Sequence, residues 1–112
     1  MRAALLLSLV MPGAIQAADP PPVVTDVDYQ PLAANAERVA KTLEFLGTPL
    51  PAETAKALTA ADKTQDVRAI QKALDPLALV VVTINPESRV KANRGPADAK
   101  LQQSGYTPVL VV

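Results

Sequence analysis

The residue types present in this chain limit the chemistry that it can perform. Its 112 residues include neither histidine nor cysteine. Without imidazole or thiol groups there can be no Ser-His-Asp or Cys-His nucleophilic site, no zinc site of the usual kind, no disulfide and no lipid-modified cysteine. An enzyme would depend on Asp, Glu, Lys, Ser or Tyr alone, and no pair of these lies at a diagnostic spacing. We therefore predict that the chain is not an enzyme and has no catalytic, cofactor-binding or metal-binding residues.

Two carboxylates near the N-terminus form a candidate cation site. Asp26 and Asp28 would point the same way on an extended chain, because successive side chains alternate in direction. A calcium ion takes at least about six oxygen ligands, and no nearby residue supplies the others. We interpret the pair as part of a solvated acidic arm that lies against a basic strand later in the chain.

The basic segment from Arg89 to Lys100 is the one local patch to weigh as a binding site. It carries four positive charges against one aspartate, whereas the whole chain has eleven basic and eleven acidic residues. The patch lacks interleaved aromatic side chains on which nucleic-acid bases could stack. Asn93–Pro96 is not a phosphate loop, because it lacks a Lys-Ser/Thr pair and the further glycines. We expect no nucleic-acid binding and interpret the charges as protection of a strand edge.

The N-terminal residues predict export. One arginine precedes an apolar stretch from Ala3 to Met11, and a Pro-Gly break follows. This pattern is typical of a secretory signal peptide covering residues 1–17, with cleavage after Ala17. The alternative is an N-terminal anchor, but the apolar stretch is about half of the ~20 residues that a spanning helix needs. We expect a secreted or periplasmic protein whose mature chain has no membrane span.

The remaining chain divides into three parts. Residues 18–30 are a Pro-rich acidic linker, in which Pro20–Pro22 favour an extended polyproline tether. Residues 31–76 are helical, and residues 77–112 form a β region. Helices of the expected lengths are marginally stable alone, so they must pack on one another and on the strands.

Apolar periodicity predicts three short helices, Pro31–Leu46, Ala52–Ala61 and Gln65–Leu74. In the first helix the apolar stripe lies opposite an ion pair between Glu37 and Lys41. Thr64 is the predicted N-cap of the third helix. Phe45 lies off the apolar stripe, and we expect it to pack under the following loop.

The β region is organised around Leu77–Ile84, which is apolar and β-branched enough to be a strand buried on both faces. Pro86 cannot adopt the positive φ of a two-residue hairpin turn, so the next loop should have three to five residues. The following strand, Arg89–Asn93, alternates charged and apolar side chains. We predict that Val90 and Ala92 point inward.

A last strand is predicted within Tyr106–Val112, at a sheet edge because Pro108 cannot donate a ladder hydrogen bond. The expected fold class is thus α+β, with a signal peptide, three short helices and a small antiparallel β region. The sequence ends on Val-Leu-Val-Val without a polar tail or turn. We interpret residues 77–112 as the truncated start of a β-sandwich.

Four strings in the sequence carry a family resemblance: Thr42–Pro51, Leu74–Pro76, Thr83–Lys91 and Arg94–Ala97. From about Leu32 to Val112, the chain resembles the N-terminal, pre-catalytic segment of planctomycete-type secreted proteins related to the CehA/McbA metallohydrolases. The resemblance implies that the last strand continues into a β-sandwich-like region, followed by a PHP-type hydrolase domain with His and Asp metal ligands. None of those ligand positions exists in this chain, so the resemblance implies an accessory module.

Two functions follow as expectations. The first is a non-catalytic accessory or interaction module, an N-terminal fragment of a secreted hydrolase-like protein whose partner is its parent hydrolase domain. The second is a free-standing exported protein that binds a protein partner by adding a strand to the edge at Tyr106–Val112.

Overall fold

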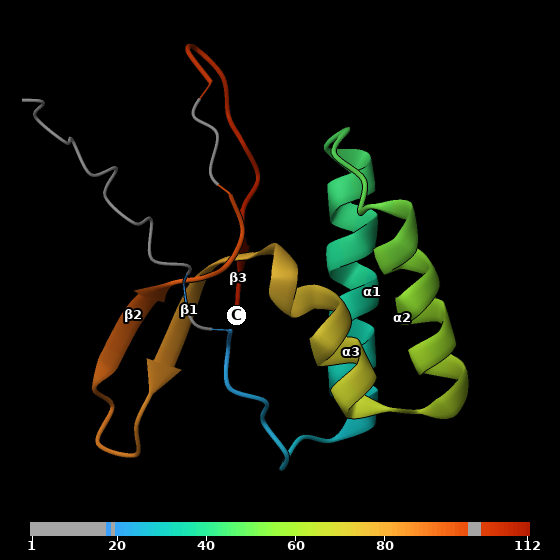
Figure 1. Cartoon of the computed structure of the whole chain (residues 1–112), viewed down its shortest axis with the longest axis vertical. Coiled ribbons are helices and arrows are strands. Elements are labelled where there is room, and N and C mark those ends of the chain that lie inside the picture. Colours follow the sequence, from blue (N-terminus) through green and yellow to red (C-terminus); the bar gives the residue numbers. More distant parts are fainter. Residues whose placement is uncertain (1–17, 19, 99–101) are drawn as a thin grey trace, which may run out of the picture.

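The computed structural model describes residue 18, residues 20–98 and residues 102–112. The predicted signal peptide and Lys100 of the basic segment lie outside the described residues. The element order is α1 (Tyr29–Phe45), α2 (Ala52–Thr64), α3 (Val67–Leu74), a 3-10 turn η1 (Asp75–Leu77), β1 (Ala78–Ile84), β2 (Val90–Arg94) and β3 (Leu110–Val111) (Figure 1). The protein is therefore α+β, as predicted.

The helices form where the periodicity places them, but their ends differ. Helix α1 begins at Tyr29, so Pro31 lies in its first turn, and the chain leaves the helix at Gly47 with φ of +76°. Helix α2 continues to Thr64, and Gln65 adopts the left-handed conformation after it. The N-cap of α3 is Asp66 and not the predicted Thr64. Its carboxylate accepts hydrogen bonds from the backbone N–H groups of Arg68 and Ala69 at 2.9 and 3.1 Å.

A small apolar core holds the helices together. Its buried members among the helices are Ala36, Ala61, Ile70 and Leu74. Three of the packing partners around it are Leu32, Leu58 and Leu110, so strand β3 contributes to the helical core. The prediction that Phe45 packs under a loop is wrong, because this residue is 91% exposed at the end of α1. Within the described chain, no helix is both long and apolar enough to cross a bilayer.

The strands form one mixed sheet in the order β2-β1-β3. Strands β1 and β2 pair antiparallel across a five-residue loop, residues 85–89, as the proline argument predicted. The expectation of a purely antiparallel β region is wrong, because β3 pairs parallel to β1. The reason is the connection: after β2 the chain passes to the other edge of β1 and returns in the direction of β1 (Figure 1).

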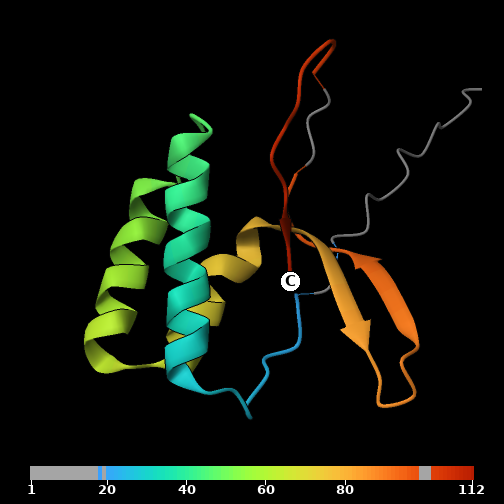
Figure 2. The same ribbon diagram turned by 180° about the vertical axis from the view of Figure 1, so that it is seen from behind.

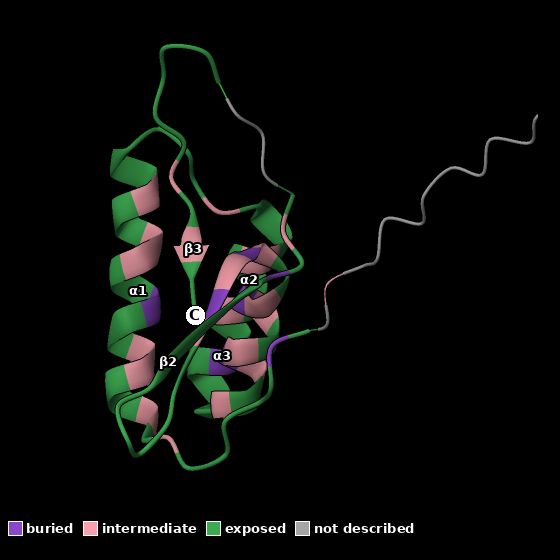
Figure 3. Ribbon diagram, turned by 90° about the vertical axis from the view of Figure 1, so that its left-hand side faces the viewer, coloured by how far each residue is buried: buried purple, intermediate pink, exposed green. Residues whose placement is uncertain are grey.

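The sheet is only partly covered. Ala78 and Val81 of β1 are buried, whereas Thr83, Ile84 and the whole of β2 are exposed (Figure 3). Views from both sides show the β1–β2 hairpin extending away from the helices (Figure 2). The inward orientation predicted for Val90 and Ala92 is therefore wrong as a statement of burial, because no described layer covers this end of the sheet.

The segment before α1 is attached to α3. Pro21 is buried, and the side-chain amide of Gln71 bonds to both backbone groups of Val24. The Val24 N–H donates to Gln71 Oε1 at 2.9 Å, and Gln71 Nε2 donates to the Val24 carbonyl at 2.8 Å. This double contact fixes the position of the acidic arm beside the helices.

Candidate functional site

The acidic and basic residues singled out from the sequence stay apart. Asp26 and Asp28 are exposed, and no ion pair joins either to β2 in the described part of the chain. Arg94 donates to the Ala97 carbonyl at 3.1 Å, and Arg89 pairs with Glu87 at 3.2 Å. Among the described residues there is no group of three or more side chains that could hold a metal ion. The expected contact between acidic arm and basic strand is thus not formed.

The hairpin carries an exposed apolar face. Val82 lies directly opposite Ala92, and Ile84 lies opposite Val90. Residues that face one another across an antiparallel pair project on the same side of the sheet, so these four side chains form one patch. Ile84 and Val90 are each 67% exposed. We call these four residues the hairpin face.

The other side of the same hairpin is polar. Thr83 lies opposite Lys91, and Asn93 lies opposite the buried Val81. Only the Val81 end of this side is covered, while Lys91 and Asn93 are exposed. The hairpin is therefore amphipathic, with its polar side suited to solvent and its apolar side left uncovered by the residues that the structure describes.

A second open feature is the edge of β1 beyond β3. The Val112 N–H donates to the Val80 carbonyl at 3.0 Å, and the Val82 N–H donates to the Val112 carbonyl at 2.6 Å. Backbone groups alternate in direction along a strand, so the N–H and C=O of Ile84 point to the same side as those of Val82. No described strand lies beside Ile84 on that side.

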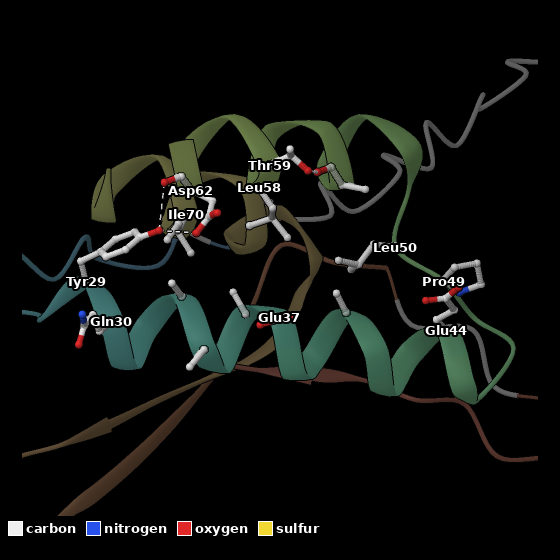
Figure 4. Close-up of a pocket in the computed structure, with 15 residues that line it drawn as sticks. Tyr29, Gln30, Glu37, Glu44, Pro49, Leu50, Leu58, Thr59, Asp62 and Ile70 are labelled. Atoms are coloured by element: carbon white, nitrogen blue, oxygen red, sulfur yellow. Dashed lines mark hydrogen bonds between the residues drawn. The ribbon is translucent and has the colours of Figure 1, made fainter. Parts of the chain in front are cut away.

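A groove runs between α1 and α2 (Figure 4). Its volume is about 790 Å³. The α1 wall is rich in alanine, with Ala33, Ala36 and Ala40, while Leu58 from α2 and Ile70 from α3 add larger apolar side chains. The apolar periodicity of the first helix predicts an apolar stripe, but an alanine-rich stripe does not reveal whether another element covers it. The groove was therefore not predicted from the sequence.

One end of the groove is closed by a hydrogen bond between the two helices. The Tyr29 hydroxyl donates to the Asp62 carboxylate and contacts the Asp62 backbone carbonyl at 3.1 Å (Figure 4). This bond raises the pKa of Tyr29 above its ordinary value of 10.0, because the neutral phenol is the donor and because ionisation would place two negative charges together. The sequence placed Tyr29 in a linker and so gave no hint of this contact.

The charged side chains that line the groove, among the residues described, are all acidic. They are Glu37, Glu44 and Asp62. Glu37 also pairs with Lys41 at 2.6 Å, but Lys41 is not part of the lining. The groove therefore combines an apolar interior with a negative rim.

These features define a small α+β domain whose described residues leave three surfaces open: the hairpin face, the edge of β1 at Ile84 and the α1–α2 groove. Comparison with protein-family models, with curated proteins and with solved structures found no match to this chain.

Proposed function

We propose that this protein is a non-catalytic interaction module at the N-terminal side of a secreted, hydrolase-like protein. The observation that carries the proposal is the uncovered hairpin face. Fully burying a Val or Ile side chain stabilises a protein by about 1.5–3 kcal/mol relative to leaving it exposed. Ile84 and Val90 leave most of that free energy unused.

We infer that a second β-layer of the same parent polypeptide covers the hairpin face. Two sheets pack face to face at about 10 Å through alternating apolar side chains, which is the pattern that the hairpin presents. The resemblance described above implies the same arrangement, since it predicts a β-sandwich-like region after this segment. Its most specific string, Thr83–Lys91, lies within the hairpin.

A pair of variants of the full-length parent tests this proposal. Replacing both Ile84 and Val90 by threonine keeps the β-propensity but removes apolar surface. We expect a lower thermal midpoint for this variant, because the layer contact is weakened. Replacing Lys91 by glutamine, on the polar side of the same hairpin, is the control and should have little effect. Equal midpoints for the threonine variant and the unaltered parent would exclude a covering layer.

A second candidate function is a free-standing exported protein that binds a partner strand at its sheet edge. It is favoured by the shortness of β3, because no strand in the described part of the chain lies beside the Ile84 backbone groups on that side. By the same alternation, Val111 directs its N–H away from β1. An added strand would bond to this outer edge of β3.

Two tests distinguish the candidate functions: the reading frame after Val112 and one variant. A reading frame that continues past Val112 into further strands supports the accessory module, whereas a stop codon there supports the free-standing binder. For the binder, Val111→Pro should abolish association measured by sedimentation velocity, because it removes the outward N–H. Val111→Thr retains that N–H and should associate normally. A monodisperse monomer at all concentrations, with no strand-adding partner, would exclude the binder.

A further inference from the structure

The α1–α2 groove plays no part in the proposed function, which depends on the sheet. The two helices form a hairpin whose ends are both fixed (Figures 1 and 4). At one end Tyr29 bonds to Asp62, and at the other the chain turns through Gly47 and the stiff Pro49-Leu50-Pro51 corner. The groove is therefore held open by the fold.

The groove has the dimensions of a short helix. Its α1 wall extends from Tyr29 to Glu44. Fifteen steps of 1.5 Å along a helix give a length of about 22 Å, or about four turns. Its volume of about 790 Å³ can take several Leu-sized side chains. Alanine walls allow the backbone of an added helix to approach closely.

The chemistry of the walls excludes an added strand. The lining comes almost entirely from helices, whose backbone N–H and C=O groups are already bonded within the helix. An added strand would bury its own backbone groups without partners, which costs free energy. An added helix satisfies its own backbone and offers one apolar face.

The rim sets the charge of the occupant. Glu37, Glu44 and Asp62 line the groove, and none of the lysine or arginine residues that the structure describes does. An occupant with lysine or arginine beside its apolar face would be electrostatically complementary to this rim. The helices of this chain carry both signs of charge on their exposed faces, with Glu37–Lys41 and Glu53–Lys56 pairs, so a second copy fits the negative rim poorly.

We propose that the α1–α2 groove binds a basic amphipathic helix of a partner protein. The partner helix is about four turns long, with Leu-sized apolar residues at positions i, i+3, i+4 and i+7 that enter the groove. Its lysine or arginine residues flank the apolar face and lie beside Glu44 and Asp62.

Two synthetic peptides of fourteen residues would test the proposal with the purified protein. Both carry leucine at the same amphipathic positions and a fluorescent label, but one has lysine and the other glutamate at the remaining positions. We expect the lysine peptide to bind at least tenfold more tightly by fluorescence anisotropy, and its affinity to fall as salt is added. Equal affinity for the two peptides, or no binding of either, would overturn the proposal.

Substitutions inside and outside the groove test whether the lysine peptide binds there. Ala55 lines the groove and is exposed, so Ala55→Phe should fill the groove. We expect this variant to bind the lysine peptide at least tenfold more weakly. Ala60→Phe is the control, because Ala60 is also exposed on α2 but does not line this groove. Glu44→Gln should weaken binding by a few-fold and reduce its salt dependence, while Glu53→Gln should not. Peptide binding that survives Ala55→Phe would refute the assignment.

Two further measurements separate this proposal from its alternatives. Ala40→Phe fills the groove from α1, and circular dichroism shows whether each variant remains folded. If groove filling abolishes a concentration-dependent dimer and leaves peptide binding intact, the occupant is a second copy and the proposal fails. The Ile84 and Val90 threonine variants should not change peptide binding, so the sheet and the groove are tested independently.

Discussion

At the scale of single residues, the contact between Tyr29 and Asp62 joins the first turn of α1 to the last turn of α2. The two residues are 33 positions apart in the sequence. Neither local pattern nor composition could pair them, because the contact depends on how two helices cross. The apolar periodicity of residues 31–46 predicted the helix, but it placed Tyr29 outside it.

Ionisation of Tyr29 should be measurably shifted by this contact. Hydrogen bonding to Asp62 raises its pKa above 10.0, so the phenol keeps its proton to a higher pH in the folded state than in the unfolded state. The free energy of unfolding should therefore fall as pH rises above 10. Ultraviolet titration should show a high-pH step that is lost in Tyr29→Phe and moves down in Asp62→Asn. An unchanged step in Asp62→Asn would contradict the assignment.

Asp75 gives a second dependence on pH, at the acidic end. Burial raises the pKa of Asp75 above its ordinary value of 3.8, because desolvation penalises the charged form. The folded state thus binds a proton more readily than the unfolded state. The free energy of unfolding should fall as pH rises from below 3.8 through the raised value. The Asp75→Asn variant should have a higher thermal midpoint than the unaltered protein at pH 7, but not at pH 3. An equal gain at both pH values would contradict this cause.

At the scale of elements, periodicity located all three helices, and the failures lie at their ends. The predicted third helix began at Gln65 because Thr64 is a good N-cap residue. In the structure the Thr64 hydroxyl donates to backbone carbonyls of Ala60 and Ala61 inside α2. Thr64 and Asp66, two positions apart, are both residue types that cap helices, and only the course of the chain between α2 and α3 decides which of them caps α3.

Alanine substitutions at Asp66 and at Thr64 should show which of the two residues caps α3. Asp66→Ala removes both side-chain bonds to the first turn of α3 and should lower the free energy of unfolding by about 1 kcal/mol. Thr64→Ala is the control and should have a smaller effect, because the carbonyl groups of Ala60 and Ala61, which accept from the Thr64 hydroxyl, lie within α2. Chemical denaturation of both variants provides the measurement. A larger loss for Thr64→Ala would show that the cap is misassigned.

The strands were harder to predict than the helices. The hairpin and its five-residue loop follow from local residues, namely the β-branched run of β1 and the proline at 86. The parallel pairing of β3 does not, because it is set by the path of the intervening residues across β1. The alternation in β2 correctly identifies which side chains share a face, but it cannot reveal whether anything covers that face.

At the scale of the whole molecule, Gly95 connects the hairpin to the rest of the fold. It is buried, and its N–H donates to the Leu79 carbonyl at 2.8 Å. A Cβ at this position would lie 2.2 Å from the Ala78 carbonyl oxygen, which is backbone and cannot move aside. The chain can therefore leave β2 here only through glycine.

Gly95→Ala should accordingly destabilise the protein. We expect a loss of about 1–3 kcal/mol in the free energy of unfolding, typical of overpacking, measured by chemical denaturation. Gly105→Ala is a matched control, because its nearest neighbour would be the flexible Gln102 side chain at 3.3 Å. If the two variants have equal stability, the close approach at Gly95 does not constrain the fold.

Among the described residues, the hydrogen bonds that join the acidic arm to the helices come from one amide group, since Gln71 provides both the donor and the acceptor for Val24. Slow deamidation of Gln71 to glutamate would leave an oxygen facing the Val24 carbonyl, and two acceptors repel one another. The arm would then separate from the helices without any change in their own sequence. Protein that has aged in storage should become more sensitive to proteases between residues 20 and 28 than freshly purified protein.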